Sequence, residues 1–165
     1  MRRRHLLISG AWLLHAVAWF LPAIRGIQGG EIDTTVPGWA AFLYASCAVR
    51  PCGASFDTWH DAVLAAVSVV TTLLFIFGSP WVVSRGSRSV RRASAWIATA
   101  AFLINAHWYV LWGPTRSDLG LGYYLWWLSF LILAIALFDP AAGRNANDLT
   151  ESGALPGPAA GADAK

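Results

Sequence analysis

Charge is the scarcest property of this chain. Asp, Glu, Lys and Arg together make up 13% of the 165 residues, whereas a soluble domain carries about 25%. The charged residues are also unevenly placed, because they leave four long stretches almost free of charge. A domain folded in water exposes mainly charged and polar side chains, so this composition argues against a soluble protein.

Cysteine and histidine are also rare, and the usual ligand patterns of metal sites are missing with them. The chain has two cysteines and four histidines, and they do not form the spaced pairs of zinc or iron–sulfur sites. No catalytic motif is recognisable, which leaves the chain without a predicted enzyme class. The net charge of +3 is too small to indicate binding of nucleic acid. We therefore predict no cofactor, no metal and no nucleic-acid partner from motifs.

Four long apolar blocks account for the low charge. Each block approaches the length of about 20 residues with which a helix crosses the ~30 Å hydrocarbon core of a bilayer. Their residues do not alternate between apolar and polar, as the strands of a membrane barrel would. We therefore predict an all-α fold, an integral membrane bundle of four transmembrane helices within residues 1–139, with spans at about 6–24, 59–83, 93–112 and 121–138.

The positive charges predict the orientation of these spans. One side of the four-span topology receives Arg2, Arg3, Arg4, Arg85, Arg88, Arg91, Arg92, Arg144 and Lys165, and the other receives Arg25, Arg50 and Arg116. Short loops rich in Arg and Lys stay in the cytoplasm. We therefore expect both termini in the cytoplasm. The use of one Lys against eleven Arg is typical of a GC-rich bacterial genome, so the expected location is a bacterial inner (plasma) membrane.

The first apolar block has a second interpretation. A basic start followed by an apolar core also resembles a secretory signal peptide. The candidate cleavage site at Leu21-Pro22-Ala23 lacks the small residue that is needed two positions before Ala23. We therefore favour an uncleaved first transmembrane helix.

The connection between the first two spans, residues 25–58, is expected to form a cap on the outer side. Pro37 is suited to a first helical turn because it has no N–H to leave unpaired. The apolar run from Trp39 to Tyr44 is too short to span, so we predict a short interfacial helix that lies on the membrane surface or folds onto the bundle. A cap over the helix ends is the favoured role, and a lid or docking surface is the alternative.

Both cysteines, Cys47 and Cys52, lie in this outer loop. The space outside an inner membrane is oxidising, which predicts a disulfide between them. Pro51 favours a break in the chain that lets the two residues meet. A redox-active pair, as in four-helix membrane thiol oxidases, is the alternative. The likeness to those proteins is limited to the helix count and an outer-loop cysteine pair, since the C-x-x-C spacing is absent here.

The second span has a clear start signal. Thr58 and Asp61 have the spacing of a capping box, with Asp in place of the usual Glu. This structural role is sufficient to explain Asp61.

Three polar residues are predicted at membrane depth: His15, Asn105 and His107. Polar groups in hydrocarbon are costly and usually face the interior of a bundle. By helical spacing, His15 and Asn105 each lie on a stripe of small residues, and the second span has a third such stripe. We expect these three stripes to pack together, with His15 and Asn105 bonding across helices. His107 lies on a different face from Asn105.

The leading functional hypothesis is an accessory or scaffold subunit that acts by association with a membrane protein partner or with itself, and whose other partner is the lipid bilayer. The alternative is a membrane oxidoreductase or electron carrier that binds haem or quinone. His15 and His107 are candidate axial ligands for haem, and His60 pairs with His107 more easily in depth. The second alternative is an oligomeric transporter. The tail, residues 140–165, is rich in Ala, Gly and Pro and is expected to be a disordered cytoplasmic segment.

Overall fold

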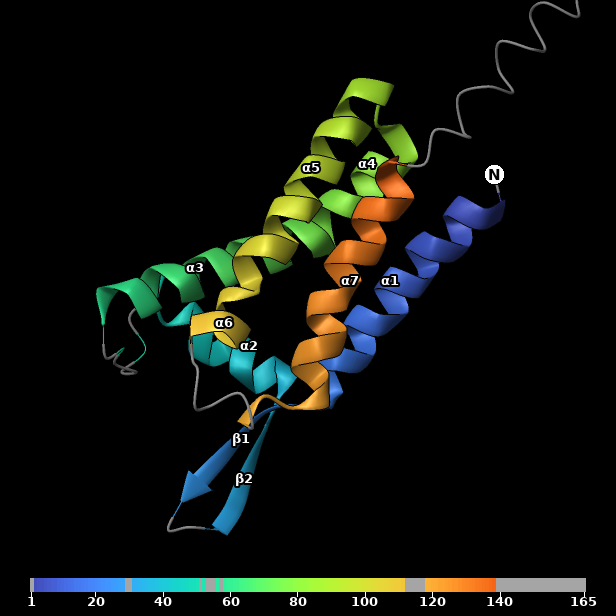
Figure 1. Ribbon diagram of the computed structural model, residues 1–165. Coiled ribbons are helices and arrows are strands. Elements are labelled where there is room, and N and C mark those ends of the chain that lie inside the picture. The colour runs from blue at the N-terminus through green and yellow to red at the C-terminus, as the bar shows by residue number, and fades with distance from the viewer. Residues whose placement is uncertain are drawn as a thin grey trace, which may run out of the picture.

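The computed structural model describes residues 2–28, 31–50, 52, 56, 58–111 and 118–138. This part of the chain is mostly helical, with one small hairpin (Figure 1). Trp112 and the tail 140–165 lie outside the described residues. In chain order the elements are α1 (Arg2–Phe20), β1 (Pro22–Gln28), β2 (Glu31–Pro37), α2 (Gly38–Ser46), α3 (Trp59–Leu73), the π-helical turn η1 (Leu74–Gly78), α4 (Ser79–Arg85), α5 (Arg88–Asn105), α6 (His107–Leu111) and α7 (Leu121–Phe138).

Helix α7 is the centre of the bundle. It makes its most extensive contacts with α1 and α5, and Figure 1 shows α1 and α7 side by side over their length. Buried alanines such as Ala11, Ala98 and Ala134 let the three helices approach closely. The expected direct packing of the small-residue stripes is present between α3 and α5, where Ser68 bonds Asn105. It is wrong for α1, which packs mainly on α7. The stripes are buried, but α1 and α5 each pack mainly on α7.

Helix α3 continues through η1 into α4 with a marked change of direction. Pro80 has no N–H, and its ring would clash with the carbonyl of Ile76 in a regular α-helix. The extra residue in the π-helical turn Leu74–Gly78 relieves that clash one turn earlier. As a result α3 diverges from the α1–α7 pair, whereas α4 runs beside α5 (Figure 1).

The predicted span 93–112 is not one continuous helix. Helix α5 ends at Asn105, and α6 begins at His107 in a new direction (Figure 1). Two side chains of α7 donate to carbonyls at the break, of which that of Phe102 also accepts from the Ala106 N–H at 3.2 Å. Trp127 Nε1 donates to the Phe102 carbonyl at 2.7 Å, and Tyr123 Oη donates to the Asn105 carbonyl at 2.8 Å. These partners come from α7, so the break could not be read from the third block alone.

The outer loop contains a β-hairpin that the all-α prediction missed. Strands β1 and β2 pair antiparallel, from Pro22 opposite Pro37 to Gln28 opposite Glu31. The sequence signal was a Gly-Gly pair between two short segments, which is a common hairpin pattern. The expected short helix is present as α2, and it starts directly after β2.

Apolar side chains face outward over most of this bundle. Of the described helices, two are long and apolar enough to cross a membrane, Trp59–Arg85 and Leu121–Phe138. Helices α1 and α5 each include three arginines near their start, so their uncharged parts are shorter. Exposed apolar residues include Leu6, Leu13, Phe20, Val70, Leu74, Phe77, Trp96, Leu103 and Ile135, while the buried polar residues include His15, Ser68, Thr71, Thr72, Ser79, Asn105 and Ser129.

Candidate binding cavity

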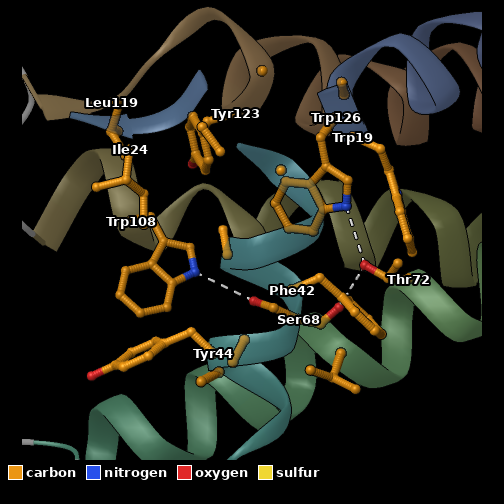
Figure 2. A pocket seen from close by; sticks show the side chains of 18 of the residues that line it. Trp19, Ile24, Phe42, Tyr44, Ser68, Thr72, Trp108, Leu119, Tyr123 and Trp126 are labelled. Atoms are coloured by element: carbon orange, nitrogen blue, oxygen red, sulfur yellow. Dashed lines mark hydrogen bonds between the residues drawn. The ribbon is translucent and has the colours of Figure 1, made fainter. Parts of the chain in front are cut away.

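The divergence of α3 leaves a cavity of about 260 Å³ between α2, α3, α7 and the ends of α1 and β1. Drug-sized ligands occupy sites of roughly 300–1,000 Å³, so this cavity is slightly smaller than that range and suits a smaller ligand. Figure 2 shows the aromatic side chains that surround it, which are contributed by elements far apart in the sequence.

One face of α3 forms the longest wall of the cavity. Its lining residues follow helical spacing from Asp61 through Ala65, Ser68 and Val69 to Thr72. At 1.5 Å per residue, this wall is about 16 Å long. The small side chains along it leave room, and the cavity therefore has one end at the first turn of α3 and another deep in the bundle.

Two glycines bring the neighbouring elements close enough to shape the cavity. A Cβ at Gly38 would collide with the carbonyl of Ala18, and one at Gly122 would come within 2.6 Å of the carbonyl of Leu21. The N–H of Gly38 donates to the same Leu21 carbonyl at 3.0 Å. These contacts hold the starts of α2 and α7 against the end of α1.

Aromatic rings form most of the remaining wall. The rings of Trp19 and Phe42 stack with centroids 5.4 Å apart, and those of Tyr44 and Phe56 are 5.5 Å apart. Trp108 and Trp126 also line the cavity (Figure 2).

The polar groups at the deep end are bonded to one another. Trp108 Nε1 donates to Ser68 Oγ at 3.3 Å, and Trp126 Nε1 donates to Thr72 Oγ1 at 3.1 Å (Figure 2). The hydroxyls also have partners behind the wall: Ser68 Oγ donates to Asn105 Oδ1 at 2.7 Å, and Thr72 Oγ1 donates to the Ser68 carbonyl at 2.9 Å. Both indole donors are therefore used in holding the wall together.

Asn105 links α5 to α3, in agreement with the expected bond across helices. It is 0% exposed, and its Nδ2 donates to Thr71 Oγ1 at 3.1 Å and to the Ala101 carbonyl at 2.8 Å. Together with the bond from Ser68, this satisfies the amide group. Asn105 does not line the cavity itself, so we assign it a structural role behind the cavity wall.

Asp61 is the one charged residue among the described residues that line the cavity. Thr58 Oγ1 donates to its carboxylate at 2.8 Å, and the Asp61 N–H donates back to Thr58 Oγ1 at 3.2 Å. The N-cap expected at Thr58 is thus present, and the Asp61 carboxylate accepts from the Thr58 hydroxyl in place of the backbone N–H of a full capping box. In the described part of the chain, no Arg or Lys forms an ion pair with this carboxylate.

His15 lies elsewhere, between α1, η1 and α7. Its Nδ1 is 3.0 Å from Ser129 Oγ, and its ring stacks on Phe75 with centroids 4.2 Å apart. Ser129 Oγ already donates to the Trp126 carbonyl at 2.6 Å, so His15 Nδ1 is the donor of the pair. The buried Nε2 has no hydrogen-bond partner among the described residues. His15 bonds across helices as expected, but to α7 and not to α3 or α5.

His107 is separated from both other candidates. It begins α6, and its Nδ1 donates to the Ile104 carbonyl at 2.7 Å. Neither His107 nor His15 lines the cavity. The described residues contain no group of three His, Cys, Asp or Glu side chains that could hold a metal ion. Haem ligation by the two histidines stays a prediction, and the cavity beside α3 does not support it because neither histidine lines that cavity.

Cys47 and Cys52 follow α2. Their Cα atoms are 5.3 Å apart and their sulfur atoms lie in contact. That separation lies within the range of 4.4–6.8 Å that disulfides usually adopt, so the geometry supports the disulfide that we propose here.

Comparison with known proteins does not assign the chain to a family, because no family model, no curated protein and no solved structure matches it.

Proposed function

We propose that this chain is a four-span protein of a bacterial inner membrane with both termini in the cytoplasm. The support is the reversed distribution of polarity, in which hydroxyl, amide and imidazole groups are buried while Leu, Val and Phe side chains face outward. In water such an exterior would drive association, whereas in lipid it is the expected solvent contact. The continuous helix from Trp59 to Arg85 and helix α7 provide two spans, and α1 and α5 provide the other two.

We further propose that the protein acts by binding a small amphiphilic molecule in the cavity beside α3. The observation that carries this proposal is the cavity itself, an aromatic-walled space of about 260 Å³ in a bundle whose other half is filled by side chains. Apolar and aromatic walls with a few polar groups are typical of small-molecule sites.

The binding proposal is tested with two probes of one shape, benzyltrimethylammonium and its uncharged counterpart 2,2-dimethylpropylbenzene. The full-length protein in lipid nanodiscs is titrated calorimetrically with each probe, and the heats of empty nanodiscs are subtracted. We expect saturable binding of at least one probe. The Ala65→Phe substitution fills the cavity from α3 and should weaken that binding at least tenfold. The matched substitution Ala100→Phe, on the exposed surface of α5, should leave it unchanged.

Absence of saturable binding for both probes would contradict the proposal. Equal weakening by both substitutions would also contradict it, because binding would then depend on something other than the cavity.

The expectation of an accessory or scaffold subunit is compatible with a ligand-binding role and stays a prediction. Purification from native membranes in mild detergent, followed by mass spectrometry, tests it through a partner present in near-equal amount. The oligomeric transporter also stays a prediction, which flux measurements in liposomes test.

The redox alternative lacks support at the cavity. A quinone carbonyl needs a hydrogen-bond donor, and Trp108 and Trp126 already donate to hydroxyls of α3. If the purified protein is coloured and the His15→Ala variant loses the visible absorbance, that result would support haem binding at His15.

A further inference from the structure

We infer that the ligand of the cavity carries a positive charge, and that Asp61 together with the aromatic walls selects a lipophilic cation. This inference rests on the binding role proposed above and names the chemical class of the ligand.

The first argument is the charge of the cavity. Asp61 is half-buried at the end of the wall formed by α3 and is one of the residues that line the space. Its hydrogen-bond partner among the described residues is the uncharged Thr58. His107 lies within electrostatic range of Asp61 but does not line the cavity. A carboxylate that is partly removed from water and has no Arg or Lys partner in the described part of the chain favours a cation as its neighbour.

The second argument is the nature of the walls. Rings of Trp, Tyr and Phe present faces of negative potential, which attract ammonium groups and bind quaternary ammonium ions in aromatic cages. Four elements contribute such rings here, including Trp19 of α1, Phe42 of α2, Trp108 of α6 and Trp126 of α7. An uncharged ligand would gain only the burial of its apolar surface from the same walls.

The third argument is the direction of the hydrogen bonds. An anion or a carbonyl ligand needs free donors, but the indole groups of Trp108 and Trp126 donate to Ser68 and Thr72. The carboxylate of Asp61, in contrast, can accept further hydrogen bonds. The cavity therefore offers an acceptor at one end and aromatic faces along its length, which matches an ammonium group joined to an apolar body.

The geometry also orients the ligand. Asp61 lies in the first turn of α3, and Thr72 lies about 16 Å further along the same face. The cationic group belongs at the Asp61 end, and the apolar body extends toward the ring of Trp126, which is bonded to Thr72.

The test compares the same two probes, which differ in a quaternary nitrogen against a quaternary carbon. In nanodiscs, wild-type protein should bind benzyltrimethylammonium at least about tenfold more tightly than 2,2-dimethylpropylbenzene, a factor that corresponds to about 1.4 kcal/mol. Asp61→Asn should abolish this preference by weakening only the binding of the cation. Asp61→Glu should restore it, because Glu keeps the charge and is the usual capping-box residue.

Asp118→Asn is the matched control, since it removes an acidic charge from a described residue that does not line the cavity. It should leave the preference unchanged. Helix content by circular dichroism shows whether each variant is folded, and the comparison of the two probes on wild-type protein does not depend on any variant.

Each outcome decides the question. Equal affinity for the two probes, or tighter binding of the uncharged one, overturns the inference and leaves the binding role intact. Loss of the preference in Asp118→Asn as well as in Asp61→Asn also overturns it, because the effect would then come from overall charge. Absence of binding by both probes contradicts the binding role itself.

Discussion

The two halves of the bundle are built from similar residues, but one half is closely packed and the other encloses a cavity. In the packed half, α1, η1, α4, α5 and α7 surround a cluster that contains Phe75, Phe130, Leu133 and Leu137, and the main hollow described there is about 80 Å³. In the open half, α2, α3 and the end of α1 surround about 260 Å³. Both halves expose apolar side chains and bury small ones.

The difference arises at η1. Phe75 lies in this turn, and its ring contacts those of Trp12, His15 and Phe130. After the turn the helix stays with the bundle, and before the turn it diverges (Figure 1). The kink caused by Pro80 thus separates a closely packed region, which stabilises the fold, from a region that encloses the cavity. The comparison predicts that equivalent substitutions in the two halves have unequal effects.

The largest effect is expected for removal of a large side chain from the packed half. Phe130 is 2% exposed and its ring meets those of His15, Phe75 and Trp126. Phe130→Ala should lower the free energy of unfolding by about 3–5 kcal/mol, because it leaves an unfilled cavity. Phe42→Ala, in the wall of the open half, should cost less than half as much. Unfolding in mixed micelles measures both, and equal losses would contradict the comparison.

Substitution of a small residue by a large one should also destabilise the packed half more than the open half. Ala11 and Ala65 are both 0% exposed, but Ala11 belongs to the packed cluster and Ala65 lines the cavity. Ala11→Phe should destabilise the protein by about 1–3 kcal/mol through overpacking. Ala65→Phe has space available and should change the unfolding free energy by less than about 1 kcal/mol. The comparison is wrong if Ala65→Phe is the more damaging substitution.

The disulfide is expected to stabilise the open half. In the chain-entropy estimate, a bridge between Cys47 and Cys52 contributes roughly 2 kcal/mol. Cys47→Ser should therefore reduce the unfolding free energy by about this amount under oxidising conditions and by nothing after reduction. Alkylation in native membranes checks the bridge itself. Modification of both cysteines without prior reduction would rule it out.

The smallest effect is expected at the boundary between the halves. Asn105→Ala removes hydrogen bonds to Ser68 and Thr71, and such bonds between membrane helices average about 0.6 kcal/mol each. The expected loss is about 1 kcal/mol. Thr99→Val is the control, because Thr99 Oγ1 bonds only the Ala95 carbonyl of its own helix. A loss in Thr99→Val as large as that in Asn105→Ala would remove the case for a cross-helix role.

The sequence predicted the helices better than their arrangement. Local signals placed α3 at the capping box of Thr58 and Asp61, and the small-residue stripe correctly marked His15 as buried. The partner of His15 could not be derived, because it depends on α7 lying beside α1. The bond from Asn105 to α3, in contrast, agrees with the expected packing of their two stripes. The break at Asn105 was missed for a reason similar to that for His15, since its carbonyl is satisfied by Tyr123 of another helix.

The cavity was not predicted at all. The sequence predicts a helix start at Asp61 and a short interfacial helix at the run from Trp39 to Tyr44, and both predictions are compatible with the structure. Local patterns do not contain the direction of α3 relative to α4, which is set at η1. That direction decides whether the small face of α3 meets another helix or leaves a space. A prediction of this kind needs the packing of the whole bundle.

The most direct test of the account is the accessibility of a single cysteine placed in each half. Ala65→Cys and Ala11→Cys are made in a background that lacks Cys47 and Cys52, and spheroplasts are treated with the impermeant quaternary ammonium reagent 2-(trimethylammonium)ethyl methanethiosulfonate. A variant that keeps Cys52 alone is the exposed reference. We predict that the cysteine at position 65 is modified from outside, more slowly in the presence of Asp61→Asn, and that the one at position 11 reacts only after denaturation. Equal reactivity at positions 65 and 11 would contradict the contrast between an open and a packed half.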